Sequence, residues 1–333
     1  MAIPTSVSSS FLLILLLVSS LLSLSLSASS RCHPDDKRAL LAIKKSLNPQ
    51  NFASWNPRTD CCGWDDVICD ADDQVVRLYI RYTTMIGSIP AAVGDLRYLE
   101  ILDFSYINNL TGSIPYSITK LQNLKSLTIS RTSVTGPVPE FLSQLKNLES
   151  LDLSFNELSG PIPASLADLT KLGYLVLRVN KLTGTIPDSL GRFKSNFTTF
   201  DLSHNELSGT IPKSLGGLNF QGIGLSDNNL VGDASMLFRE NSDALWYDLS
   251  RNQLDFDLSK VRFPKTTSSL DLSHNRIRGS IPKQLTELSV AELDLSYNRL
   301  CGEIPIGGNL QTLGSGPFYH NKCLCGSPLP KCK

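Results

Sequence analysis

Six aspartates recur along the chain about 24 or 48 residues apart, and each stands between two apolar residues. A pair of carboxylates can cleave a glycosidic bond. Here, however, the carboxylates form a periodic ladder, which implies no deep pocket, and the chain has no G-x-S-x-G, P-loop or H-E-x-x-H motif. We therefore expect no enzyme activity, no catalytic residue and no cofactor. The alternatives are an acidic strip that steers a basic partner, or a row that keeps an exposed edge solvated. The six are Asp103, Asp152, Asp201, Asp248, Asp271 and Asp294.

A second row follows, at the expected end of each outward-facing segment. It mixes aromatic, arginine and histidine side chains, which on an exposed face are typical of an interaction surface rather than a solubility surface. We expect His204 and His274 to be contacts and not catalytic bases. The row is Tyr82, Ile107, Arg131, Phe155, Val179, His204, Asp227, Arg251, His274 and Tyr297.

Both rows lie in copies of one unit, whose clearest example is the segment 151–163, LDLSFNELSGPIP. In each copy two apolar residues such as Leu151 and Leu153 would point inward from a short strand, and the residue between them would point outward. Stacked in register, the copies predict a parallel sheet along one wall. The first apolar residues lie 23 to 25 residues apart and are Leu78, Leu102, Leu127, Leu151, Leu175, Phe200, Ile223, Tyr247, Leu270 and Leu293.

The rest of each unit predicts its other walls. An asparagine five residues after the first apolar residue, such as Asn156, should turn inward and bond backbone groups. Gly and Ile-Pro predict a second extended segment and a turn, and Leu166, Leu169 and Leu172 indicate a short or 3₁₀ helix opposite the sheet. The seventh and eighth copies lack Ile-Pro, so the second segment should be weakest there. An extra residue within 106–109 predicts a bulge in the second copy.

This unit is identified as the leucine-rich repeat in its L-x-G-x-I-P variant. The identification implies an α/β solenoid, namely a right-handed superhelix. It would have a concave parallel sheet, a second short sheet, and 3₁₀ or short helices on the convex side. Such a solenoid needs caps at both ends. We expect an N-terminal cap over residues 31–74, ten repeats over 75–305 and a C-terminal cap over 306–333. Within the first cap, residues 34–47 have a helical apolar stripe, and Trp55 and Trp64 would cover the first repeat.

Eight cysteines lie only at the two ends of the repeats. Four in each cluster allow three pairings per cluster, and adjacent Cys61 and Cys62 cannot easily pair with each other. We predict two disulfide-stapled caps, the second staple beginning at Cys301. A zinc site is the weaker alternative, since there is no C-x-x-C pair and neither His33 nor His320 fits a finger spacing. The cysteines are Cys32, Cys61, Cys62, Cys69, Cys301, Cys323, Cys325 and Cys332.

Residues 1–30 carry no charge and contain a serine-interrupted apolar run, 11–26, followed by small residues. This is typical of a secretory signal peptide, and the run is short for a membrane anchor. We expect a secreted, extracellular protein that does not span a membrane. The 31 basic and 31 acidic residues cancel, which argues against nucleic-acid binding. Asn109 and Asn196 begin N-x-T sequons, and their glycans should lie off the binding face.

The mature chain resembles the polygalacturonase-inhibiting proteins of plants over essentially its full length. The matching segments are CHPDDK at 32–37, DCCGW at 60–64, GDAS at 232–235, LCGEIP at 300–305 and NKCLCGSPLP at 321–330. The resemblance implies a defence protein of the plant cell wall space that binds endopolygalacturonases of fungi, and of insects, through its concave face and so limits pectin degradation. It also implies the pairings Cys32–Cys61, Cys62–Cys69, Cys301–Cys323 and Cys325–Cys332.

The resemblance implies that the contacts concentrate on the outward positions of the central strands. Some family members carry more acid in the fifth and seventh strands, where this chain has Arg178 and Gly224. Members that hold pectin do so through a basic row, for which only Arg131 and Arg251, with His204 and His274, are available. The expected contacts are Thr128, Arg131, Asp152, Phe155, Val176, Arg178, Asp201, His204, Gly224, Asp227, Asp248, Arg251, Asp271 and His274.

Two other functions are compatible with the repeat. The first is a signalling ectodomain or co-receptor for peptide ligands, against which no membrane span or kinase follows Cys332. The second is ice binding, which would favour a regular outer row of threonines or asparagines rather than a charged, irregular face. In each case we expect a monomer without a metal site.

Overall fold

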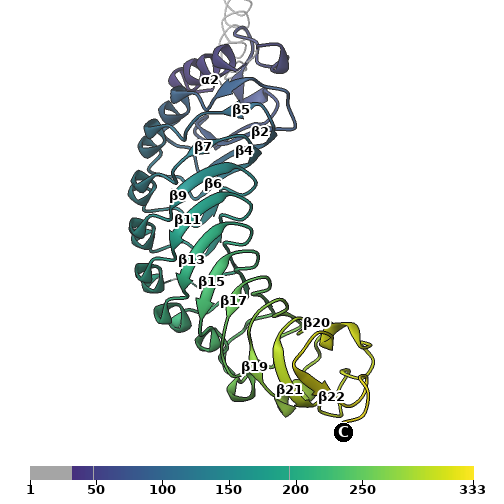
Figure 1. The fold of residues 1–333 in the computed structure, drawn as a ribbon. Helices are drawn as coiled ribbons and strands as arrows, with labels where there is room; N and C mark the ends of the chain where they lie inside the picture. Colours follow the sequence, from purple (N-terminus) through teal and green to yellow (C-terminus); the bar gives the residue numbers. More distant parts are fainter. Residues whose placement is uncertain (1–31, 48, 195) are drawn as a thin grey trace, which may run out of the picture.

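The strands predicted from the apolar repeat form one long sheet along a curved solenoid (Figure 1). The computed structural model describes residues 32–47, 49–194 and 196–333, so the predicted signal peptide lies outside the described residues. Ten strands of this sheet are parallel, and each contains one of the first apolar residues in register with the next, as Leu151 pairs with Leu175. The parallel strands are β2 (Val75–Arg81), β4 (Ile101–Ile107), β6 (Ser126–Thr132), β8 (Ser150–Asp152), β10 (Tyr174–Val176), β12 (Thr199–Asp201), β14 (Gly222–Gly224), β16 (Trp246–Asp248), β18 (Ser269–Asp271) and β20 (Glu292–Asp294).

A second, shorter sheet lies beside the first, as Gly and Ile-Pro predicted. It ends at a two-residue strand in the eighth copy. The predicted weakness of the seventh and eighth copies is not confirmed, because the seventh copy has a four-residue strand and the second and ninth copies, which have Ile-Pro, also have strands of only two residues. Its strands are β7 (Thr135–Gly136), β9 (Glu157–Pro161), β11 (Lys181–Thr185), β13 (Glu206–Thr210), β15 (Asn229–Gly232) and β17 (Gln253–Leu254). Flanking it are a two-stranded sheet, β3 (Gly87–Ser88) with β5 (Leu110–Thr111), and a three-stranded one, β19 (Arg278–Gly279), β21 (Arg299–Glu303) and β22 (Cys323–Cys325).

Short 3₁₀ helices line the outer side of the arc, visible as the coils at the left of Figure 1. The proline of Ile-Pro precedes most of them with φ near −65°, which suits the residue before a helix. Where this proline is missing, as before η9 and η10, the helix shortens from five residues to three. The helices are η3 (Ala91–Asp95), η4 (Tyr116–Lys120), η5 (Glu140–Gln144), η6 (Ala164–Asp168), η7 (Asp188–Arg192), η8 (Lys213–Gly217), η9 (Ser235–Leu237), η10 (Leu258–Lys260) and η11 (Lys283–Glu287).

The inward asparagines form the predicted ladder. Asn205 donates from Nδ2 to the carbonyls of Leu177, Leu202 and Ser203 at 3.0–3.2 Å, and its Oδ1 accepts from the Leu182 amide at 3.0 Å. Each rung therefore ties together three backbone segments from two repeats and satisfies their polar groups. The ladder runs one rung further than the sequence prediction, because Asn321 in the C-terminal cap binds Leu295 and Leu300 in the same way.

The caps close the ends of one continuous apolar core. Helix α2 (Pro34–Ser46) buries Leu40 and Ile43, and Trp55 and Trp64 stack at 5.6 Å beside it, as expected. An unpredicted strand, β1 (Val67–Cys69), pairs antiparallel with β2 and so covers the open edge of the sheet. The helices η1 (Pro49–Asn51), η2 (Cys61–Gly63) and η12 (Gly316–Phe318) complete the caps. All four disulfide pairings implied by the family resemblance are confirmed.

Candidate functional site

The first outward residues after the leading apolar position form a row along the middle of the concave sheet. Strand pairing places them side by side, from Tyr79 and Asp103 at one end to Asp271 and Asp294 at the other. We call this the central row. It consists of Tyr79, Asp103, Thr128, Asp152, Val176, Asp201, Gly224, Asp248, Asp271 and Asp294.

The central-row carboxylates are bound to the protein as well as turned outward. In Asp152 and Asp201, Oδ1 accepts a hydrogen bond from the backbone amide two residues later at 2.9 Å, and Asp248, Asp271 and Asp294 do the same. This bond satisfies an amide where the chain leaves the strand. One oxygen of these five carboxylates therefore has a structural role, and in Asp152, Asp248, Asp271 and Asp294 the other remains for a partner.

The members of the central row are not equally exposed, although the alternation of side chains predicted that all of them would face outward. Asp103, Val176 and Asp201 are only 5–7% exposed, so a partner can reach little of them. Asp103 lies beneath Arg81, which donates to its Oδ2, and Asp201 lies 3.7 Å from Arg178 Nη1. Cations on neighbouring strands thus cover these two carboxylates.

Burial also changes the proton affinity of two central-row aspartates. Desolvation raises the pKa of Asp152, opposed by hydrogen bonds from Ser154 and reinforced by the charges of Asp103 and Asp201. Desolvation likewise raises the pKa of Asp271, next to Asp248 and Asp294. These carboxylates hold a proton to higher pH than an exposed aspartate.

A second row runs along the carboxyl ends of the strands, and every member has a left-handed backbone with φ between 49° and 58°. We call this the rim column. The sequence prediction of Ile107 as a member is wrong. Ile107 is fully buried and Tyr106 takes the place, because the extra residue in the second copy falls after the turn rather than before it. The rim column is Tyr82, Tyr106, Arg131, Phe155, Val179, His204, Asp227, Arg251, His274, Tyr297 and His320.

Neighbours in the rim column contact one another in three groups. At the N-terminal end Tyr82 stacks on Tyr106 with centroids 4.5 Å apart, and Arg131 lies between Tyr106 and Phe155. In the middle Asp227 lies 3.3 Å from His204 Nδ1 and 3.8 Å from Arg251 Nε. At the C-terminal end three rings stack at 4.2 Å spacing, those of His274, Tyr297 and His320. The rim column is a packed ladder rather than a set of free side chains.

Two aromatic residues of the concave face were missed by the sequence prediction. Tyr174 and Trp246 stand one residue before the first apolar residue of their repeats. This preceding position also points outward on these strands. Burial raises the pKa of Tyr174, and the charges of Asp152 and Asp201 raise it further. The signal that could have found them was period-2 alternation extended one step backward.

The predicted contacts share one face. Thr128, Asp152, Val176, Asp201, Gly224, Asp248 and Asp271 lie in the central row, and Arg131, Phe155, His204, Asp227, Arg251 and His274 in the rim column. Arg178 lies between the rows and replaces the buried serine found there in neighbouring copies, such as Ser154. The sequons lie elsewhere. Asn109 is exposed between β4 and β5, whereas exposed Asn196 lines a shallow hollow with Lys171 and Tyr174, close to the amino end of the sheet.

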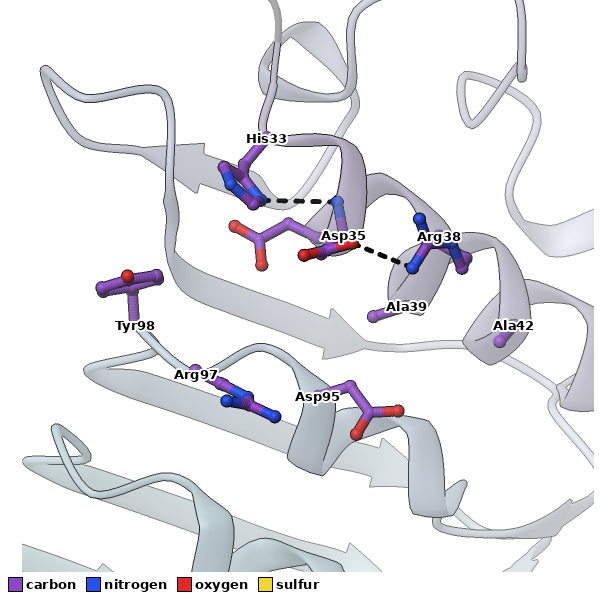
Figure 2. A pocket seen from close by; sticks show the side chains of 9 residues that line it. His33, Asp35, Arg38, Ala39, Ala42, Asp95, Arg97 and Tyr98 are labelled. Atoms are coloured by element: carbon purple, nitrogen blue, oxygen red, sulfur yellow. Dashed lines mark hydrogen bonds and ion pairs between the residues drawn. The ribbon is translucent and has the colours of Figure 1, made fainter.

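A separate cavity of about 510 Å³ lies between α2 and the segment after η3 (Figure 2). His33 Nδ1 accepts from the Asp35 amide at 3.4 Å, and Asp35 pairs with Arg38 at 2.9 Å. Arg97 and Asp95 face them from the first repeat. The cavity is open and of mixed charge, at the N-terminal end, and it includes none of the predicted contacts.

Neither a metal site nor a membrane span emerges from the described part of the chain. The sulfurs of Cys32, Cys61 and Cys62 lie with an Asp60 oxygen within 4.8 Å of one another, but all three cysteines are in disulfides and have no thiolate to offer. No described helix is both long and apolar enough to cross a bilayer.

Known proteins resemble this chain over nearly its whole length. Residues 33–70 match the leucine rich repeat N-terminal domain, and residues 122–182, 196–218 and 266–288 match leucine rich repeat models. A polygalacturonase inhibitor of Pyrus communis is 57% identical, with 98% of each chain covered, and one of Vitis vinifera is 56% identical over 98% of this chain and 97% of its own. A plant ice-binding protein of known structure superposes with a TM-score of 0.89 at 45% identity, covering 91% of this chain and 99% of its own. The chain belongs to the polygalacturonase inhibitor family of leucine-rich repeat proteins.

Proposed function

We propose that this protein is a secreted inhibitor that binds fungal endopolygalacturonases on its concave face and so limits pectin degradation in plant defence. The observation that supports the proposal is that the central row and the rim column lie side by side on the concave face. It presents carboxylates, arginines and rings on one rigid surface, in the chain of a family named for this inhibition. Insect enzymes are a further target class, and pectin a further ligand.

Binding fits the geometry better than catalysis. Five of the six central-row carboxylates accept from a backbone amide, Asp103 accepts from Arg81, and the face around them is an open sheet rather than a closed pocket. A catalytic acid or nucleophile acts best in a site that excludes water, which an open sheet does not provide. The relatives at 56–57% identity are named as inhibitors of an enzyme and not as enzymes.

The covalent chemistry supports an extracellular compartment. Four disulfides hold the two caps, which suits an oxidising environment outside the cell. We place the mature protein in the cell wall space after removal of residues 1–30, as a monomer of two caps and ten repeats. N-glycans would sit on Asn109 and Asn196, the second beside the amino edge of the sheet.

Neither alternative function is favoured. Ice binding calls for a regular polar array. In this chain an ion pair between Lys181 and Glu157 at 3.1 Å crosses the second sheet, and the six aspartates of the central row lie along the first. A receptor ectodomain also binds on the concave face. The relatives at 56–57% identity are named as enzyme inhibitors, however, whereas a solved peptide hormone receptor is 30% identical and this chain covers 39% of it.

Inhibition of pure enzymes tests the proposal. The mature protein is expected to reduce the release of reducing ends from polygalacturonate by at least some fungal endopolygalacturonases near their acidic optimum. The matched control is the same protein with its disulfides reduced and alkylated, which should lose the caps and the inhibition together. A panel of enzymes that showed neither inhibition nor binding would contradict the proposed function.

A further inference from the structure

The N-terminal end of the rim column is a stack in which one cation is held between two rings. The guanidinium carbon of Arg131 lies 3.9 Å from the Phe155 ring centroid and 5.2 Å from that of Tyr106. Tyr82 continues the stack beyond Tyr106. Because these residues come from consecutive repeats, their spacing is set by the sheet, and the stack exists before any partner arrives.

Arg131 differs from the other arginines near the strand ends in its lack of an acidic partner. Arg81 pairs with Asp103, Arg178 faces Asp201 at 3.7 Å, and Arg251 faces Asp227 at 3.8 Å. Within the residues that the structure describes, Arg131 has no carboxylate oxygen within 4.0 Å, and its side chain is exposed. The cation–π contacts with the two ring faces stabilise its positive charge in place of a carboxylate.

The stack determines where the Arg131 donors point. A guanidinium presents its N–H groups in its own plane, as a fork that matches the two oxygens of a carboxylate. With a ring on each side of the guanidinium, the space left for an incoming group lies between the rings, toward solvent. The neighbouring ring edges carry partial positive charge as well. Little side-chain freedom remains to be lost when a carboxylate binds.

We infer that Arg131, held between Tyr106 and Phe155, is a pre-organised receptor for an aspartate or glutamate side chain of the bound enzyme. The inference rests on the proposed function and adds the chemistry of one contact. The central row lies alongside it: Thr128 pairs with Asp152 on the neighbouring strand, and Arg131 and Phe155 each follow three residues later in the same two repeats. The face therefore fits a partner surface on which a carboxylate adjoins basic groups.

A pectin uronate is the less suitable occupant of this fork. Sugars pack on the faces of aromatic rings, but Tyr82 and Tyr106 cover each other, and Phe155 is covered by Arg131 and by Arg178 at 5.2 Å. A single uncompensated arginine also gives no row of cations along which an extended polyanion could lie. A carboxylate on a folded protein needs only the one fork.

Two variants of the full mature chain separate the fork from its charge. Arg131→Lys keeps a cation but has no planar fork, and Arg131→Gln has neither. Against a polygalacturonase that the wild-type protein inhibits, both are expected to raise the Kd about ten- to one-hundredfold, the range of a charge-assisted hydrogen bond. The control is Arg276→Gln, which also removes one exposed positive charge but lies outside both rows, where Arg276 donates to Gln253 at 2.8 Å. It should change the Kd by less than about twofold.

The partner group is then found with a double-mutant cycle. Surface Asp and Glu residues of the enzyme are changed one at a time to Asn and Gln. One of these changes should weaken binding to the wild-type inhibitor and have no further effect on Arg131→Gln. Thermal melting of both Arg131 variants, expected to match the wild type, verifies that they fold.

Each contrary result has a distinct meaning. If the wild-type protein inhibits and the Arg131 variants inhibit equally well, this inference is wrong and the proposed function stands. Full affinity in Arg131→Lys alone would also overturn it, since charge without a fork would then suffice. So would an Arg131→Gln protein that loses binding to a galacturonate decamer but not to the enzyme. Absence of inhibition by the wild-type protein contradicts the proposed function itself.

Discussion

The indole of Trp246 on β16 lies against Gly222 on the neighbouring strand β14. A Cβ atom on residue 222 would come within 1.9 Å of Cε2 and Nε1 of the indole, so this arrangement requires glycine. The position of Trp246 on the concave face therefore depends on a glycine in the preceding repeat. Tryptophan is the side chain most enriched among residues that dominate binding energy.

Substitution of Gly222 by alanine should displace the Trp246 indole. We expect a loss of about 1–3 kcal/mol in the free energy of unfolding from overpacking, together with weaker inhibition. Intrinsic fluorescence reports the movement, because the other two tryptophans, Trp55 and Trp64, are buried in the N-terminal cap. The control is Gly217→Ala on η8, where an added Cβ would meet nothing within 4 Å. Unchanged emission and melting in Gly222→Ala would contradict the requirement for glycine at residue 222.

Two adjacent asparagines give a sharp test of the buried ladder. Asn228 donates to the carbonyls of Leu202, Leu225 and Ser226 at 3.1–3.2 Å, and its Oδ1 accepts from the Leu207 amide at 3.0 Å. Asn228→Ala leaves these groups buried without partners and should cost about 3 kcal/mol or more in the free energy of unfolding.

The next residue is the matched control for that change. Asn229 is exposed at the start of β15, and Asn229→Ala should alter the free energy of unfolding by less than about 0.5 kcal/mol. Urea denaturation of both variants measures the difference. Equal stability of the two would mean that water or a rearranged backbone replaces the Asn228 side chain.

Much of the fold could be predicted because one physical pattern repeats. Period-2 apolar residues such as Leu151 and Leu153 define the strands, and a buried amide such as Asn156 has to satisfy the backbone. Both features follow from residue spacing within a single repeat. The strand β1 could not be predicted, since its three residues carry no alternation, and it exists because the edge of β2 would otherwise be left open.

The site was predicted less completely than the fold. Residue spacing located the central row, but not the burial of Val176 and Asp201, which depends on neighbouring side chains such as Arg178. Ile107 lies five residues after Leu102, whereas the other predicted members lie four residues after their first apolar residue, so the count from the strand start indicates Tyr106. In the structure Tyr106 has the left-handed φ of 58° that marks the rim column.

Val179 is in the same left-handed conformation, with φ of 55°, and it is β-branched. Such a backbone costs an L-residue about 1–2 kcal/mol, and least for glycine and asparagine. Val179→Asn is therefore expected to stabilise the protein by about 1 kcal/mol, with Val179→Ala between the two, as measured by chemical denaturation. The backbone bond from Val179 to the Ser203 carbonyl, at 2.9 Å, is available to all three residues. Lower stability of Val179→Asn would show that packing of the valine side chain outweighs the backbone strain.

The proton affinity of Asp152 predicts a pH-dependent gain from its replacement. Burial raises the pKa of Asp152 above 3.8, so the folded protein holds this proton more tightly than the unfolded chain. Deprotonation then opposes folding. The cost is absent below about pH 3.8, grows as the pH rises toward the folded pKa, and is constant above it. Asp152→Asn carries no charge and keeps an Oδ1 acceptor for the Ser154 amide.

The melting temperature of Asp152→Asn should therefore exceed that of the wild type at pH 7, and the two should converge near pH 3.5. Asp168→Asn serves as the control, because Asp168 is an exposed residue of η6 outside both rows, and its effect on melting should be small at either pH. A difference for Asp152→Asn that stays the same from pH 3.5 to pH 7 would assign the effect to packing. A variant less stable than the wild type at pH 7 would mean that the carboxylate charge stabilises the concave face and that burial does not raise the pKa of Asp152.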